Sequence, residues 1–124
     1  MDTSTPNAEI DFGHIKQYVG DDTALMKEVF GLFKNQVEMW SRAMIPEADD
    51  ESWGAVMHSL KGSARAVGAH KLAALCEQGE KLTGSLGGLE TRKAHIHDVQ
   101  FSVEQALIEI GRWEYIQTLA SMRS

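Results

Sequence analysis

The sequence is poor in cysteine and proline, and it contains no long hydrophobic run. Its 124 residues include a single cysteine, Cys76, and two prolines. A single cysteine excludes an internal disulfide and is typical of a reducing compartment. No apolar stretch approaches the roughly 20 residues that a membrane-spanning helix needs. The opening MDTSTPNAEI has neither the basic cluster nor the apolar run of a secretory signal, so we expect a cytoplasmic protein without a membrane anchor.

Basic residues are also scarce. The chain has 12 lysines and arginines against 18 acidic residues, which gives a formal net charge of -6. Nucleic acids and anionic membranes favour basic surfaces, so neither is an expected partner. The length suits one domain, which we expect to span residues 9–124 after a flexible tail at 1–8. Nothing in the sequence demands a dimer, and we expect a monomer.

The pattern of apolar residues is helical, and no segment alternates with the period of two that is typical of strands. It predicts a short helix at about 11–19, ended by Gly20, and longer helices at about 22–44, 50–67, 70–83 and 89–121. Long amphipathic helices joined by short loops favour antiparallel neighbours. We therefore predict an all-α fold: an antiparallel up-and-down four-helix bundle with a short extra N-terminal helix laid across it.

Apolar stripes predict which faces of these helices are buried. The predicted inner stripe of the helix at 22–44 is Leu25, Val29, Leu32, Phe33, Gln36 and Trp40. The predicted inner stripe of the last helix is Ile96, Val99, Val103, Ala106, Leu107, Ile110 and Trp113. A second stripe on the last helix is predicted to pack under the N-terminal helix and consists of Phe101, Ile108, Tyr115 and Met122.

The helix predicted at 50–67 carries a histidine that faces away from the core. On a helical wheel its apolar residues share an arc of about 100°; they are Trp53, Val56, Met57, Leu60, Ala64 and Val67. His58 projects about 150° from the centre of that arc, so it points to solvent from the middle of the helix. An exposed histidine alone indicates little, and its neighbours decide how it is interpreted.

Three neighbours on or beside this face favour a phosphoryl-accepting role. Gly62, one turn after His58, costs the helix about 1 kcal/mol relative to alanine and leaves room for a phosphoryl group or a bulky partner. Lys61 is spaced to steady the oxygens of an anionic phosphohistidine. Arg65 is a candidate for partner binding, although simple solvation of the helix explains it equally well.

Glu80 is a further candidate, from the following helix. If Gly68 and Ala69 turn the chain into an antiparallel hairpin, Glu80 stands beside His58 across the helix pair. A carboxylate that accepts from Nδ1–H would fix the tautomer and leave Nε2 as the nucleophile. An ordinary surface glutamate is the competing interpretation.

Together these residues resemble a known family. The segment H-S-L-K-G-S-A-R-A-V-G-A at 58–69 is similar to the motif of histidine-containing phosphotransfer (HPt) domains, and L-x-x-L-C-E at 72–77 resembles their next helix. The resemblance implies that His58 accepts a phosphoryl group, with Lys61 as a phosphate neighbour and Gly62 as the residue that gives clearance. It also suggests that Glu80 occupies the place where related domains put a carboxylate or amide against the imidazole.

The resemblance implies partners as well. They are the receiver domains of response regulators, whose aspartate exchanges the phosphoryl group with the histidine, and a hybrid histidine kinase. The receiver would supply Mg²⁺ and most of the catalytic groups. This chain would then need no cofactor of its own and would act as a phosphocarrier in two-component signal transduction.

Three other functions remain to be weighed. A kinase would need an ATP-binding domain, and no G-x-x-x-x-G-K-[ST] loop is present. A metal site would use His70, Cys76, His95 and His97. However, His95 and His97 are two residues apart and would project about 200° from each other on a helix, so we predict no metal. A helical module that docks partners without taking phosphate could present the same surface, although the His58, Lys61 and Gly62 face argues against it.

Overall fold

The computed structural model describes residues 9–123, which form five α-helices and one short 3-10 turn. In chain order these are α1 (Phe12–Val19), α2 (Thr23–Arg42), α3 (Asp50–Ala66), α4 (His70–Glu80), η1 (Gly84–Leu86) and α5 (Leu89–Met122). This part of the chain contains no strand, which confirms the predicted all-α class. The tail predicted at 1–8 lies outside the described residues.

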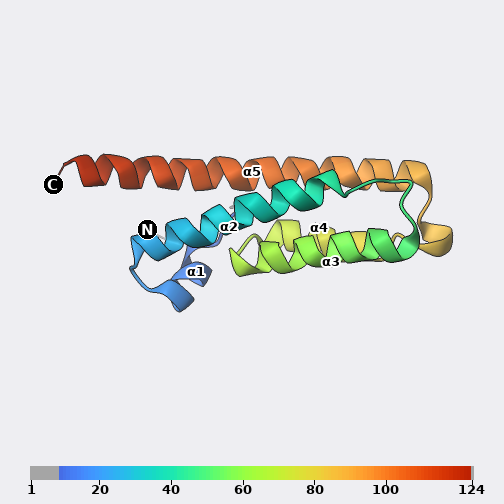
Figure 1. Ribbon diagram of the computed structural model, residues 1–124, viewed down its shortest axis with the longest axis horizontal. Helices are drawn as coiled ribbons and strands as arrows, with labels where there is room; N and C mark the ends of the chain where they lie inside the picture. Colours follow the sequence, from blue (N-terminus) through green and yellow to red (C-terminus); the bar gives the residue numbers. More distant parts are fainter. Residues whose placement is uncertain (1–8, 124) are drawn as a thin grey trace.

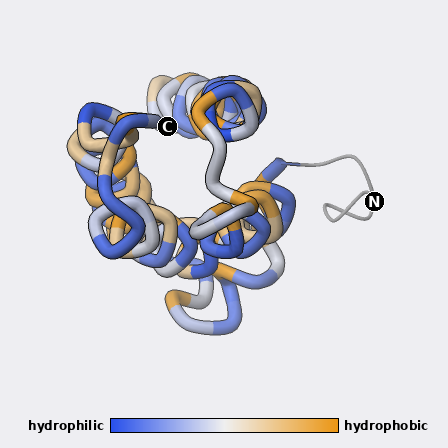
Figure 2. Tube along the Cα trace, turned by 90° about the vertical axis from the view of Figure 1, so that its right-hand side faces the viewer, coloured by the Kyte–Doolittle hydropathy of each residue, from blue (hydrophilic) through white to orange (hydrophobic). Residues whose placement is uncertain are grey.

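Helices α2 to α5 run alternately up and down along a common axis (Figure 1). Helix α3 lies against α2 and α4, and α5 lies against α4 and α2. Helix α1 lies at the end of the bundle where α2 begins. A view along the bundle shows hydrophilic and hydrophobic residues mixed within the helices (Figure 2), and the buried apolar residues form one core. The predicted bundle with an extra N-terminal helix is confirmed.

The turn between α3 and α4 brings these two helices together. It contains Gly68, which lies two residues after the end of α3 and adopts a left-handed φ of 71°. A Cβ at Gly68 would stand 2.7 Å from the backbone oxygen of Asp11. The Asp11 N–H also donates to the Gly68 carbonyl at 2.9 Å. The start of α1 therefore holds the turn that places α4 beside α3.

The inner face of α2 differs from the prediction by about one residue. Its buried residues are Met26, Phe30, Phe33 and Val37, whereas Leu25 and Leu32 are 39% and 59% exposed. Apolar residues cover a wide arc of this helix, so its pattern does not single out one stripe. Packing against α1, α3 and α5 selects the buried face.

Two other expectations are corrected at α4 and α5. Helix α4 ends at Glu80 rather than at about residue 83. The second stripe of α5 is exposed rather than packed under α1, and its members are Phe101, Ile108, Tyr115 and Met122. Helix α1 packs instead through Phe12 against Phe30 of α2 and Trp113 on the inward stripe of α5. Between residues 9 and 123 no helix is both long and apolar enough to cross a bilayer.

Candidate functional site

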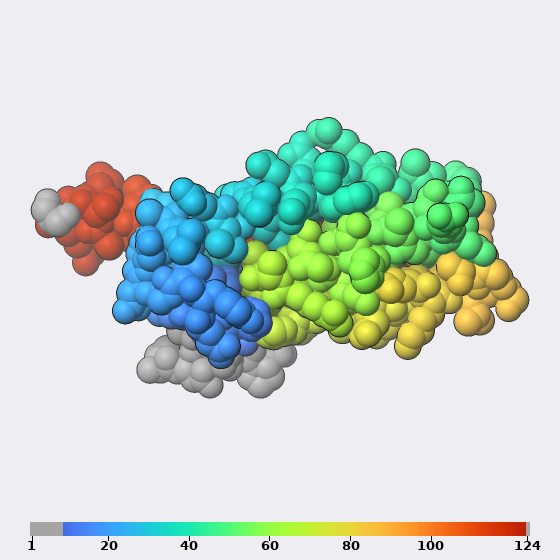
Figure 3. Space-filling view, turned by 60° about the horizontal axis from the view of Figure 1, so that its bottom comes forward, coloured from blue at the N-terminus to red at the C-terminus, as the bar shows by residue number. Residues whose placement is uncertain are grey.

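His58 lies in the middle of α3, on the side of the helix that faces solvent. Its side chain is 73% exposed. Trp53, Met57 and Leu60 of the same helix are fully buried on the opposite side, as the helical wheel predicts. Between α2 and α4 the outer side of α3 is not covered by another helix (Figure 3). A partner can therefore reach this ring without any movement of the bundle.

Glycines flank His58 one turn away on both sides. A Cβ built at Gly62 has no described heavy atom within 4 Å outside its own helix, and the same holds for Gly54. Gly62 was expected to leave this space, whereas the sequence analysis missed Gly54. Its position at i-4, on the same face of the helix as His58, is the signal that could have found it. Because neither position carries a side chain, the surface on both sides of the imidazole along the helix is open to a partner.

Lys61 does not stand free on the exposed face, which corrects the expectation for this residue. Its side chain is only 11% exposed, and its Nζ lies 2.6 Å from Oε1 of Glu80 on α4. The two charged groups form a close ion pair across the interface between α3 and α4. The aliphatic stem of a lysine can lie along a helix interface while its ammonium group reaches a charge at the edge.

Glu80 stands beside His58, where the hairpin argument places it. Its Oε1 lies 3.7 Å from Nδ1 of His58, which is longer than a hydrogen bond. The predicted hydrogen bond to Nδ1–H is therefore not formed in this state. The Lys61 ammonium is the main reason that the pKa of Glu80 lies below its ordinary value of 4.5; burial opposes this effect and His58 adds a smaller one. An ionised carboxylate thus faces the ring.

Arg65 lies one turn beyond Lys61 and remains largely exposed. Its guanidinium is 3.9 Å from a carboxylate oxygen of Glu77 on α4, and both side chains are more than half exposed. So exposed an ion pair holds its members only weakly. Arg65 is therefore free to contact a partner that approaches His58, and its role in partner binding stays a prediction.

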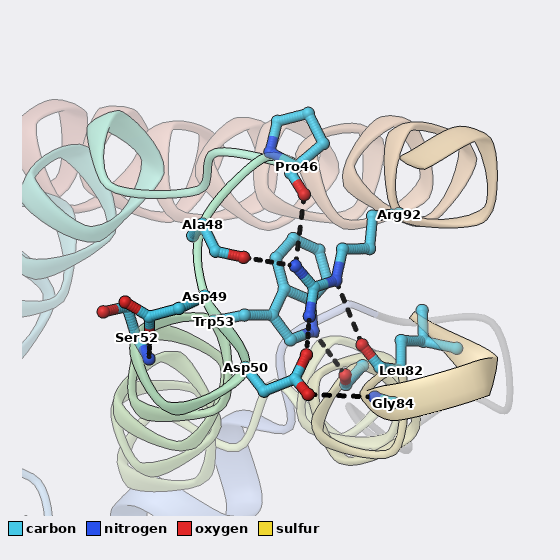
Figure 4. Close-up of polar contacts among 10 residues, drawn as sticks. Pro46, Ala48, Asp49, Asp50, Ser52, Trp53, Leu82, Gly84 and Arg92 are labelled. Carbon is cyan, nitrogen blue, oxygen red and sulfur yellow. Dashed lines mark hydrogen bonds and ion pairs between the residues drawn. The ribbon is translucent and has the colours of Figure 1, made fainter. Parts of the chain in front are cut away.

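A buried arginine links the loops at the end of the bundle where α4 ends (Figure 4). The guanidinium group of Arg92, on α5, donates to the carbonyls of Leu82, Pro46 and Ala48 and to the carboxylate of Asp50. It also lies over the ring of Trp53, 4.6 Å from the centroid. Arg92 was not predicted from the sequence. Its position one turn before Ile96, in line with the inward stripe of α5, was the available signal.

The alternative metal ligands are not brought together. His70 contacts Asp11 at 3.1 Å, and His95 lies 2.6 Å from the carbonyl oxygen of Leu75. Burial raises the pKa of the Cys76 thiol to about 12, so this residue is a core thiol rather than a thiolate ligand. Within residues 9–123 no three histidine, cysteine or acidic side chains gather as a metal site would require.

Comparison with known proteins shows the family to which this helical bundle belongs. Residues 24–113, more than half of the chain, match the Hpt domain. The chain belongs to the Hpt domain family. Among solved structures it is similar to the histidine phosphotransferase ShpA from Caulobacter crescentus, with a TM-score of 0.72 and 29% sequence identity. The similarity covers 93% of this chain and 99% of that one. No curated protein sequence matches it.

Membership confirms the resemblance stated from residues 58–69 and sets the general role of the chain. Hpt domains are histidine phosphocarriers of phosphorelays, and receiver domains are their general class of partner.

Proposed function

We propose that His58 of this Hpt domain accepts a phosphoryl group from the aspartyl phosphate of one receiver domain and passes it to the aspartate of another. The observation that carries the proposal is the exposure of the imidazole, 73%, in the middle of a 17-residue helix. Open space at Gly54 and Gly62 lets the receiver bring its aspartate close to the ring. A hybrid histidine kinase is the proposed source of the phosphoryl group.

The transfer is a substitution at phosphorus. Nε2 of the neutral ring attacks, so that a N–P bond forms while the bond between phosphorus and the receiver carboxylate breaks and the carboxylate leaves. Nδ1 keeps its proton, and the ring gains positive charge. Glu80, whose Oε1 lies 3.7 Å from Nδ1, stabilises that charge. The reverse steps deliver the group to the second receiver.

Lys61 and Arg65 have different parts in this proposal. The phosphoryl group places negative charge three residues from Lys61 along the helix, within reach of a lysine side chain. Lys61 then exchanges part of its contact with Glu80 for the phosphoryl oxygens, which are strong acceptors. Arg65 contacts the receiver at the edge of the interface. Mg²⁺ belongs to the receiver, and this chain contributes the nucleophile and its supports.

A labelling experiment tests the proposal. The chain is incubated with a receiver domain that carries radioactive aspartyl phosphate, and we expect acid-labile, base-stable label to appear on it. His58→Gln should retain the helical circular dichroism of the wild type and take up no label, because the nucleophile is removed from an exposed position. Label on His58→Gln at the normal rate would overturn the assignment. Receiver binding by a wild-type chain that takes no label would favour a docking module instead.

A further inference from the structure

The residues around Glu80 are held from two other helices. Gly79, directly before it, places its carbonyl 2.7 Å from Nε1 of Trp53, and both residues are buried. The same carbonyl accepts from the Leu82 N–H at 3.0 Å. Leu82, two residues after Glu80, in turn offers its own carbonyl to Nε of Arg92 at 3.0 Å. The backbone on each side of Glu80 is therefore tied to a different helix, Trp53 to α3 and Arg92 to α5.

These ties act close to His58 because the helices approach each other tightly here. Trp53 lies five residues before His58 on α3, and Met57 lies directly before it. A Cβ at Gly79 would stand 2.6 Å from Sδ of Met57 and 2.9 Å from a ring nitrogen of His95. A side chain at this position would have to displace the side chains of Met57 and His95, so glycine lets the end of α4 pack close to α3 and α5. Any slip of α4 along α3 would move Glu80 relative to the ring.

Arg92 joins the two ties into one unit. Its guanidinium lies over the Trp53 ring, so the group that holds Leu82 also fixes the indole that holds Gly79 (Figure 4). The same guanidinium bonds Asp50, whose other oxygen accepts from the Gly84 N–H at 3.0 Å and so closes the loop after α4. Helix α4 has no basic residue in its last turn and lacks a side-chain cap at its start. Its buried face packs against α3, and the contacts of Trp53 and Arg92 add polar ties at its end.

We propose that Trp53 and Arg92 are positioning residues for phosphotransfer, which hold the end of α4 so that Glu80 stays within reach of both His58 and Lys61. The inference rests on the proposed function of Glu80 at the ring. Neither residue touches the reacting atoms, and their effect passes through the Glu80 carboxylate. One indole N–H and one guanidinium bind the two backbone carbonyls that lie on either side of Glu80.

The test uses Trp53→Phe, which keeps an aromatic ring under Arg92 but removes the N–H that holds Gly79. Two quantities are measured in the full chain: the rate of transfer from a phosphorylated receiver, and the pKa of Glu80 from the ¹³C shift of its carboxyl carbon. We expect transfer to slow by about threefold, less than the loss in Glu80→Gln, because a misplaced supporting group costs rate without removing the nucleophile. We expect the pKa of Glu80 to rise toward its ordinary value as the Lys61 contact loosens.

Two comparisons separate positioning from a general loss of stability. In the Glu80→Gln background Trp53→Phe should have no further effect on the rate, because the group through which it acts is absent. Ile110→Val, a core change at the other end of α5, should lower the melting temperature without changing the rate or the pKa of Glu80. A rate loss in Trp53→Phe that persists in full on the Glu80→Gln background would overturn the proposal, and so would an unchanged pKa of Glu80. If the wild-type chain takes no phosphate, the proposed function fails and the titration alone decides the role of Trp53.

Discussion

Lys61 and Glu80 form an ion pair across the interface of α3 and α4, with Nζ and Oε1 2.6 Å apart. The same oxygen of Glu80 is the one that lies 3.7 Å from Nδ1 of His58. One carboxylate oxygen therefore serves two side chains of α3, a nearly buried ammonium and an exposed ring. Because the ring, the carboxylate and the ammonium lie within a few ångströms of one another, a change in the charge of the ring or of its phosphoryl group alters the electrostatic energy of the ion pair.

Replacing Glu80 by glutamine should weaken both its ion pair with Lys61 and its electrostatic contact with His58. The amide keeps the shape but removes the charge that faces the ring and the ammonium. We expect transfer to slow by about fivefold, equivalent to roughly 1 kcal/mol of transition-state stabilisation. The free energy of unfolding should fall by about 1 kcal/mol, a value kept low because Glu80 is partly screened by solvent. Quench-flow labelling and urea unfolding measure the two effects.

Glu77→Gln is the matched control for this change. Glu77 lies one turn before Glu80 on α4, and its pairing with Arg65 at 3.9 Å is exposed. Its replacement should leave both the stability and the intrinsic transfer rate within error of the wild type. Equal effects of the two substitutions would show that charge on α4, rather than the position of Glu80, matters.

The lowered pKa of Glu80 predicts a specific pH dependence of stability. In the folded state the pKa lies below its ordinary value of 4.5, chiefly because of Lys61. The unfolded chain therefore binds more protons in this range, and the stabilisation is complete above about pH 4.5 and is lost as the pH falls through the lowered value. Urea unfolding at a series of pH values should show the difference between wild type and Glu80→Gln shrinking on acidification. A difference that stays constant down to about pH 3 would contradict the ion pair as the cause.

The sequence predicts much of the site because helical geometry alone orients it. Periodicity places His58 and Gly62 on the outer side of α3, and the left-handed Gly68 sets the hairpin that brings Glu80 beside the ring. Each of these inferences needs only residues close in sequence. A helical wheel and the register of a hairpin are enough to place these residues on their faces.

The parts that the sequence did not predict depend on where long side chains end. A wheel assigns Lys61 to a face from its Cα, but its ammonium group lies about four carbons away and is drawn to Glu80. Arg92 is buried only because carbonyls at Pro46, Ala48 and Leu82 converge on it from two loops. The pattern of α5 places Arg92 in line with the inward stripe, but it does not indicate that these carbonyls lie there. The buried face of α2 was missed for a similar reason, since contacts with three other helices select it.

Gly62→Ala should stabilise the fold and slow phosphoryl transfer. Replacing a helical glycine that has open space around it by alanine raises the free energy of unfolding by about 0.5–1 kcal/mol. Side chains on a helix lean toward its N-terminus, so a methyl group at position 62 points toward the space beside His58 through which a receiver approaches. We expect slower transfer with a higher melting temperature, measured on the same preparation. Gly62→Val should slow it further.

Gly54 and Gly111 supply graded controls for this prediction. Both have open space around their Cβ positions among the described residues. A methyl group at Gly54 leans away from His58, so Gly54→Ala should slow transfer less than Gly62→Ala does. Gly111 lies on α5, far along the chain, and Gly111→Ala should stabilise the helix without any change in rate. Equal rates for all three alanine variants would refute the argument that Gly62 gives clearance.

The last turns of α5 should be dispensable. The fully buried residues of this helix end at Ile110, followed by the half-buried Trp113 and by Glu114, which pairs with Lys34 at 2.6 Å. Residues 118–123 are all exposed, and the end of the helix extends beyond the rest of the bundle (Figure 1). A chain that stops after Gln117 should keep its transfer rate and its free energy of unfolding within about 0.5 kcal/mol, because no buried contact is removed.

Sedimentation of the two chains completes this test, because the removed segment includes Leu119 and Met122, which are 39% and 75% exposed. If the protein is a monomer, as we expect, both chains sediment as single copies and unfold at temperatures independent of concentration. If the apolar residues of this segment instead pack against a second copy, the full chain sediments as a dimer and the shortened chain does not. The stability of the full chain would then fall with dilution, because association stabilises the fold only while the second copy is bound. That outcome would overturn both the predicted monomer and the dispensability of the helix end.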